Sequence, residues 1–221
     1  MKIVRWLTIA AAAVVAVAPA AWAQAVDPGA VLDRASAAYE PVQTLSANFL
    51  QVVTNPLVGA PDTTLGKLYQ QRPSYFEMRF TSPAGDRIVA DGRYLWLYTP
   101  STTPGQVIRS PIPAAGTTGP NLIGQFVDHA RSRYDATFVR TDSLQDGVAD
   151  VIALVPIAHD LPYDKAVIWV ARADTMVRRL EITESSGQMR VIVLRDLQVN
   201  APVPGAAFKF SVPRGVRVVT Q

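Results

Sequence analysis

The chain has 221 residues, 49% of them hydrophobic, which is enough for one domain with a substantial core. It contains no cysteine, and this excludes disulfides, thiol catalysis, zinc–thiolate sites and a lipid attached to cysteine. The formal charge is +3, but two basic residues lie in the N-terminal segment, and the remaining 19 basic and 18 acidic residues nearly cancel. We therefore expect no nucleic acid or other polyanion as a partner.

The N-terminal segment has the pattern of a secretory signal peptide. Two basic residues precede an apolar run over residues 7–18, and Ala21-Trp22-Ala23 fits the small-x-small cleavage rule. The run is shorter than the roughly 20 residues of a membrane-spanning helix, although an uncleaved anchor is the alternative. We expect a signal peptide over residues 1–23 and a single exported domain over residues 24–221.

The first predicted element of the mature chain is a short amphipathic helix. Asp27 is a favourable N-cap, and Pro28 suits the first helical turn. Val31, Ala35 and Tyr39 follow on one face at helical spacing. The helix should end just beyond Tyr39, where another proline approaches.

Beyond this helix the hydrophobic period changes to two, which predicts β-strands. Turn signals separate the strands, and Asp91-Gly92 is a strong signal for a tight hairpin. Short hairpin links indicate an antiparallel meander that forms a large sheet, barrel or sandwich. The candidate strands cover residues 45–53, 63–71, 75–81, 86–91, 93–99, 106–111, 134–141, 147–156, 163–172, 176–184 and 188–200.

One segment interrupts this rhythm. Residues 111–120 are rich in proline, glycine, alanine and threonine, and this composition is typical of a loop. Leu122, Ile123 and Phe126 then follow helical spacing and predict a second short amphipathic helix. The sequence indicates no internal repeat and no second domain.

The strand faces suggest what the sheet encloses. Phe76, Met78 and Phe80 share one face of their strand, and Val191 and Val193 mark the apolar face of the last long strand. Only two short helices are predicted to cover these apolar faces. The apolar faces of the strands form either an ordinary core or, in part, the lining of a ligand cavity.

The sequence offers little catalytic chemistry. His129 and His159 each neighbour an aspartate, but adjacent side chains on a helix or strand point apart. No metalloprotease, nucleophile-elbow, P-loop or dinucleotide motif is present. A triad or a carboxylate pair assembled from distant residues is the alternative. We nominate no catalytic residue and no metal ligand, and we expect no cofactor.

Arg72 is the charged residue that stands out. It lies in Gln71-Arg72-Pro73, at the turn between two predicted strands and just before the apolar Tyr75-Phe76. A guanidinium has five donors and can clamp carbonyl oxygens, while the proline fixes the backbone beside it. The alternative is an ordinary exposed arginine in a turn.

Four stretches resemble the signatures of one family in order and spacing. Phe49-Leu50-Gln51 matches F-x-Q, and residues 66–76 (GKLYQQRPSYF) match G-x-L-x-x-x-R-P-x-x-F. Residues 90–98 (ADGRYLWLY) match a D-G-x-x-L-W-x-Y hairpin, and residues 208–216 (FKFSVPRGV) match F-x-F-x-x-P-x-G-V. Together these motifs resemble the LolA family of periplasmic lipoprotein carriers over essentially the whole mature chain.

The resemblance implies an unclosed antiparallel β-barrel of about eleven strands, with amphipathic helices forming a lid over a hydrophobic cavity. The predicted helix that holds Leu122, Ile123 and Phe126 would belong to this lid. The family role implies a monomeric, non-enzymatic periplasmic chaperone. It would take lipid-modified lipoproteins from an inner-membrane ABC transporter and pass them to an outer-membrane receptor. Alternatives are a carrier of another lipid or glycolipid, a sensor or assembly module of the same fold, and an enzyme acting on lipids.

The resemblance also implies roles for individual residues. Arg72 is expected to hold the lid closed through hydrogen bonds to lid-helix carbonyls. Phe76 is expected to face the cavity. Strand alternation together with the resemblance adds Phe49, Met78 and Trp96 to the apolar lining.

Overall fold

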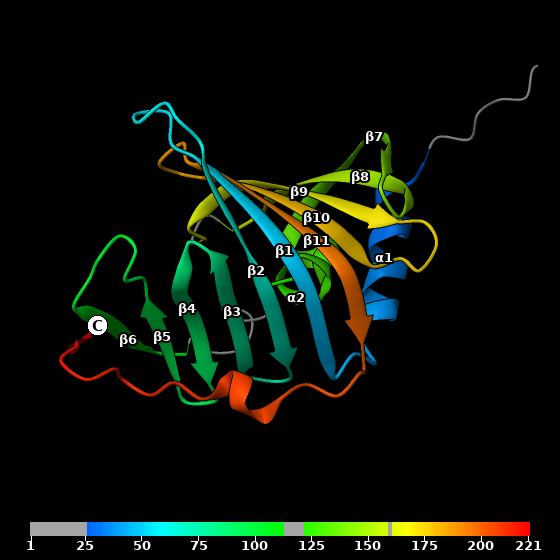
Figure 1. Cartoon of the computed structure of the whole chain (residues 1–221). Coiled ribbons are helices and arrows are strands. Elements are labelled where there is room, and N and C mark those ends of the chain that lie inside the picture. The colour runs from blue at the N-terminus through cyan, green and yellow to red at the C-terminus, as the bar shows by residue number, and fades with distance from the viewer. Residues whose placement is uncertain (1–25, 113–121, 159–160) are drawn as a thin grey trace, which may run out of the picture.

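The computed structural model describes residues 26–112, 122–158 and 161–221 (Figure 1). The predicted signal peptide, most of the loop before the second helix, and the His159-Asp160 pair lie outside these residues. The described chain forms a single sheet of twelve strands. Their order across the sheet is β12-β6-β5-β4-β3-β2-β1-β11-β10-β9-β8-β7.

Eleven of the strands agree closely with the segments of period two, because alternating apolar residues and intervening turn residues specify each of them locally. The twelfth, β12, was not predicted, since four residues are too few to display a period. The strands are β1 (Thr44–Thr54), β2 (Asp62–Gln71), β3 (Tyr75–Ser82), β4 (Ala84–Asp91), β5 (Tyr94–Tyr98), β6 (Gln106–Pro111), β7 (Tyr134–Leu144), β8 (Gly147–Pro156), β9 (Tyr163–Ala171), β10 (Val177–Glu184), β11 (Met189–Val199) and β12 (Arg217–Thr220).

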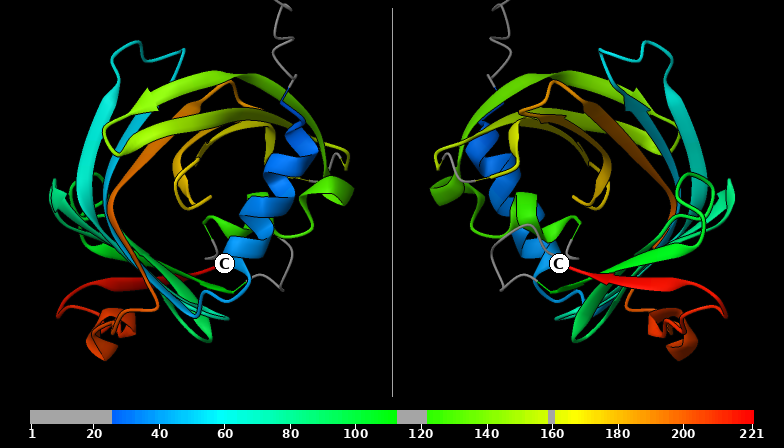
Figure 2. Two further views of the ribbon diagram at one scale, coloured as in Figure 1. Left: turned by 90° about the vertical axis from the view of Figure 1, so that its right-hand side faces the viewer. Right: turned by 90° about the vertical axis from the view of Figure 1, so that its left-hand side faces the viewer.

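The sheet curls into a barrel that does not close. Strands β1 to β11 pair antiparallel with their neighbours, and β12 and β7 form the two edges of the sheet. The expected unclosed antiparallel barrel is therefore confirmed, with one addition: β12 pairs with β6 in parallel. Figure 2 shows helix α1 lying across the opening of the curved sheet, with the shorter helices beside it.

Helix α1 (Pro28–Tyr39) begins where its cap predicts. The Gly29 amide donates to the Asp27 carboxylate over 2.9 Å, which satisfies one of the free donors of the first turn. Val31 and Tyr39, one face of the helix, are each only 1% exposed. This apolar face of α1 packs against the concave side of the sheet.

Two helical turns replace the single second helix that the spacing predicted. They are α2 (Gly124–Val127) and α3 (Ala130–Arg133). Between them His129 adopts a left-handed conformation with φ of 54°, which interrupts the helical hydrogen bonds and redirects the chain. Hydrophobic spacing alone does not reveal such a break, because the apolar residues before and after it still face the core.

The core fills the space between the concave side of the sheet and the helices. One cluster of buried apolar side chains draws on α1, α2 and strands from both halves of the sheet, for example Leu32, Phe126 and Ile168. A second, smaller cluster surrounds Trp169 on the other side of β9. The main cluster is the surface that any ligand inside the barrel would contact.

The face assigned to the last long strand was wrong. Ile192 and Leu194 enter the core at 2% and 1% exposure, whereas Val191 and Val193 lie on the other face. A β-bulge at Asp196, whose φ is 52°, then shifts the register of β11 against β1. Beyond the bulge, the side chains that point inward are therefore those of the opposite parity. Both faces of this strand carry valine, leucine or isoleucine, so composition did not separate them.

The C-terminal segment covers part of the convex side of the sheet. After β11 the chain passes through a 3-10 helix, η1 (Gly205–Phe208), which packs against β3 and β4 (Figure 1). Glu77 points outward from β3, yet it is fully buried and binds both Arg79 and Arg87. Arg87 also donates to the Lys209 carbonyl over 3.4 Å, which ties the segment to the sheet.

Candidate functional site

Three of the four nominated lining residues lie in the main core cluster beneath the helices. Phe49, Phe76 and Met78 are 2%, 5% and 5% exposed. The Phe49 ring packs edge-on against Phe80 at a centroid distance of 5.2 Å, and it also lies over Gly66. A Cβ at that glycine would come within 2.6 Å of the ring, which gives the glycine of the G-x-L motif a steric reason. That these side chains bind lipid stays a prediction.

Trp96 does not lie with them, and its assignment to the interior was wrong. Its strand neighbour Leu95 packs against the core cluster, so alternation turns Trp96 to the convex side. There it stacks on Phe210 of the C-terminal segment at 5.3 Å and donates to the Asp91 carboxylate over 2.7 Å. β5 is aromatic on one face and leucine-rich on the other, so apolar character alone did not choose between them.

Asp91 explains the hairpin motif that contains it. Partial burial alone would raise the pKa of this carboxyl, but hydrogen bonds from the Tyr94 amide, Trp96 and the Arg93 amide outweigh it. The pKa of Asp91 is therefore lowered from its ordinary value. These hydrogen bonds fix the β4–β5 turn.

The lid side of the cluster is held by aromatic packing and by hydrogen bonds. Phe126, fully buried in α2, packs between Tyr134 and Tyr163 at centroid distances of 6.4 and 5.7 Å. The two tyrosine hydroxyls lie 2.7 Å apart, and that of Tyr134 donates to the Gln125 carbonyl. Burial raises the pKa of both phenols, which keeps them protonated.

The other two nominated lid residues lie just before α2. Ile123 is its N-terminal flanking residue and is 2% exposed, and Leu122 is half-buried against the same cluster. The structure thus brings all three nominated lid residues to the core. It places two of them in a turn, not in the helix itself.

Arg72 joins the sheet to both helical elements. Its Nη1 donates to the Glu40 carbonyl at the end of α1 over 3.3 Å, and its Nη2 lies 3.6 Å from the Asp128 carboxylate, which follows α2. Its guanidinium carbon lies 4.6 Å from the centroid of the Tyr39 ring. The contacts therefore involve one carbonyl, one carboxylate and one ring, where the resemblance implied hydrogen bonds to lid-helix carbonyls.

Two residues that sequence reasoning missed complete this junction. Tyr39 and Gln70 are both buried and share a hydrogen bond of 3.1 Å between the hydroxyl and the side-chain amide oxygen. Burial raises the pKa of Tyr39 to about 12, although the bond with Gln70 and the charge of Arg72 oppose the shift. The position of Gln70 on the apolar face of β2, two residues before Arg72, was the available signal.

The described residues hold no group of three or more side chains suited to a metal ion, and the described helices include none long and apolar enough to cross a membrane. Of the two histidines, His129 is the described one, and it is exposed. What the residues build is an apolar interior closed by helices, with one polar junction at its rim. This arrangement suits reversible shelter of an apolar ligand.

Comparison with known proteins identifies the fold and the family together. The family model described as "Outer membrane lipoprotein carrier protein LolA" matches residues 40–211. This chain belongs to the LolA family. The match covers β1 to β11, Arg72 and the start of the C-terminal segment.

Curated relatives agree with the family assignment. An outer-membrane lipoprotein carrier protein of Pectobacterium carotovorum subsp. carotovorum is 32% identical over 182 residues, covering 81% of this chain and 83% of the relative. Another from Methylobacillus flagellatus is 29% identical over 181 residues, covering 82% and 84%. Among solved structures, an uncharacterized conserved protein from Thermus thermophilus has a TM-score of 0.54 at 14% identity, with 87% of this chain and 98% of that chain covered. The last similarity concerns the fold alone.

Proposed function

We propose that this LolA-family protein carries lipoproteins through the periplasm by sheltering their acyl chains between the concave face of its sheet and its lid helices. Family membership supports the carrier role. The observation that carries the mechanism is the apolar cluster that joins α1 and α2 to both halves of an unclosed sheet. No catalytic step is part of the proposal.

The energetics of acyl chains explain why such shelter is needed. Exposing a chain to water costs about 0.8 kcal/mol per CH₂, so a chain of about fourteen methylenes costs roughly 11 kcal/mol. A carrier must offset most of this cost and still release its cargo. It does so here by exchanging one apolar contact for another, since cargo chains replace the lid side chains against the sheet.

The lid must therefore move for cargo to enter. In the closed arrangement Phe76, Met78 and Phe126 are packed within one cluster, so acyl chains displace the helices from the sheet. Arg72 holds this closed arrangement through α1 and the residue after α2. Breaking its contacts is part of the cost of loading.

The direction of transport is also a proposal. The carrier receives triacylated lipoproteins from an inner-membrane ABC transporter and delivers them as a monomer to an outer-membrane receptor, after export by a cleaved signal peptide. The family name and the N-terminal pattern support this route. It requires no cofactor in this chain, because transfer between apolar surfaces needs no covalent step.

Phe76→Glu tests the shelter. A carboxylate among acyl chains carries a large desolvation cost, so this variant should lose binding of a fluorescent fatty-acid probe and of a purified lipoprotein. Phe76→Leu keeps an apolar side chain and should bind both. Val139→Glu, which adds the same charge at a position 48% exposed, is the matched control and should bind like the wild type.

Folding must be separated from binding in this test. A thermal melt and a near-ultraviolet spectrum of Phe76→Glu establish whether the sheet is intact. A folded Phe76→Glu that binds lipid as well as Val139→Glu does would refute the proposed site. Failure of the wild type itself to bind either ligand would refute the carrier function.

A further inference from the structure

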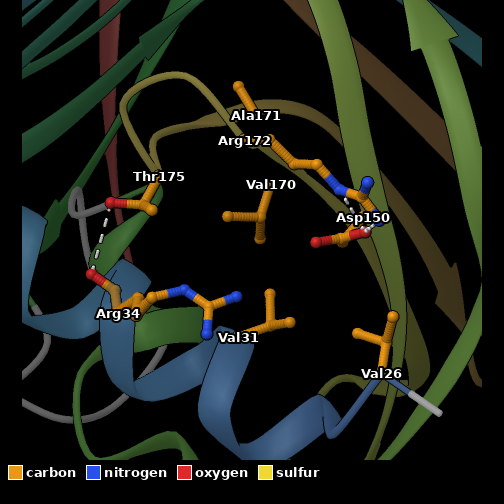
Figure 3. Close-up of a pocket in the computed structure, with 8 residues that line it drawn as sticks. All are labelled: Val26, Val31, Arg34, Asp150, Val170, Ala171, Arg172 and Thr175. Atoms are coloured by element: carbon orange, nitrogen blue, oxygen red, sulfur yellow. Dashed lines mark hydrogen bonds and ion pairs between the residues drawn. The ribbon is translucent and has the colours of Figure 1, made fainter. Parts of the chain in front are cut away.

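A pocket of about 370 Å³ lies away from the Arg72 junction, where the first turns of α1 face β8 and the β9–β10 turn. Figure 3 shows its floor and rim. The floor is apolar and includes Val31 of α1 and Val170 of β9. Both belong to the main core cluster, so the apolar interior lies directly beneath the floor of the pocket.

The rim of this pocket is charged. Arg172 donates to the Asp150 carboxylate from Nε over 2.9 Å and from Nη2 over 2.6 Å, so these two charges neutralise each other. Arg34 is the other arginine of the rim, and Figure 3 shows its guanidinium directed into the pocket beside Val31. Two arginines against one aspartate leave one positive charge.

Arg34 is available to a ligand. Among the interactions of the described residues, none involves its guanidinium. The carboxylates nearest in sequence to the rim are engaged elsewhere: Asp27 caps α1, Asp33 binds Arg131, and Asp174 binds Arg178. They do not compete for Arg34.

The pocket also lies where α1 meets the sheet through a long polar contact. The Thr175 hydroxyl lies 3.4 Å from the Arg34 carbonyl, as the dashed line in Figure 3 marks, and shares its hydrogen with the Asp174 carbonyl at 2.7 Å. A lid helix that moves away from the sheet would widen the pocket here. Its position therefore suits a point where part of a loaded ligand leaves the interior.

We propose that this pocket binds the anionic head group, carboxylate or phosphate, of an acylated ligand whose chain extends into the interior, with Arg34 as the binding residue. This proposal rests on the lipid-sheltering function above. An apolar floor with a single unpaired cation at its rim matches an amphiphile of this kind. A free inorganic anion would interact with only one net positive charge, and it has no apolar part to contact the floor.

The test compares a dansyl-labelled undecanoic acid with its neutral methyl ester, both below their critical micelle concentrations. The wild type should bind the acid roughly tenfold more tightly than the ester. Arg34→Gln should bind both equally, at the affinity of the wild type for the ester. Arg195→Gln, which removes an exposed arginine of β11, is the matched control and should keep the preference.

The outcomes separate this site from the function on which it rests. Equal binding of acid and ester by the wild type would overturn the head-group site while leaving lipid shelter intact. Binding of neither probe would overturn both. Calorimetry with inorganic phosphate completes the test: weak or absent binding supports a lipid head group, whereas tight binding that Arg34→Gln abolishes would show a site for the free anion and overturn the proposal.

Discussion

Replacement of Arg72 by leucine should loosen the lid by an amount that the geometry allows us to estimate. The variant loses the bond to the Glu40 carbonyl, the ion pair with Asp128 and the contact with the Tyr39 ring. The bond is long, so it contributes about 1.5 kcal/mol at most. The half-exposed ion pair and the ring contact add about 0.5 kcal/mol each.

The total of at most about 2.5 kcal/mol corresponds to an open-lid population up to about 70-fold larger than in the wild type. Amide hydrogen exchange in the last turn of α1 and in α2 should accelerate by this factor. Asp128→Asn removes the carboxylate charge that faces Arg72 but keeps the other contacts of Arg72, so it should accelerate exchange less than Arg72→Leu does. Arg195→Leu, on an exposed part of β11, should leave exchange in both helices unchanged.

Lid opening is linked to cargo affinity. If Arg72 stabilises the empty, closed protein as proposed, losing it lowers the cost of loading and favours the bound state. Arg72→Leu should therefore accept lipoprotein from the inner membrane but release it poorly to a receptor in a two-step transfer assay. Wild-type exchange rates in α1 together with normal release would refute the reasoning, although the shelter itself would stand.

Individual residues give three further predictions. Gly66→Ala forces a Cβ against the Phe49 ring and should destabilise the fold by about 1–3 kcal/mol in a urea melt, whereas Gly205→Ala, which meets no atom within 4 Å, should not. The pKa of Asp91 is lowered in the folded protein, so its stabilisation is complete above about pH 4 and is lost as the pH falls through the folded value. Asp91→Asn should thus lower the melting temperature more near pH 7 than near pH 3, and equal effects would contradict the assignment. The intact mass of the exported protein should match a chain that begins at Gln24. A full-length product retained in the membrane would count against cleavage.

The sequence determined the features that depend on neighbouring residues. The cap at Asp27 set the start of α1, and the alternation of Phe76, Met78 and Phe80 set the inward face of β3. Turn residues such as Asp91-Gly92 placed the strand ends to within a few residues. Each depends on local backbone preference or on side-chain periodicity, so each can be read without knowing the fold.

The tertiary structure decided what depends on contacts between distant segments. Trp96 faces outward because Phe210, more than a hundred residues later, covers the convex side of β5. Ile192 and Leu194 enter the core because β11 takes its register from β1. Arg34 lines a pocket because α1 packs against β8 and β9. The sequence shows directly whether a residue is apolar or charged. Contacts with distant segments determine which face of a strand is covered and which charge has no partner.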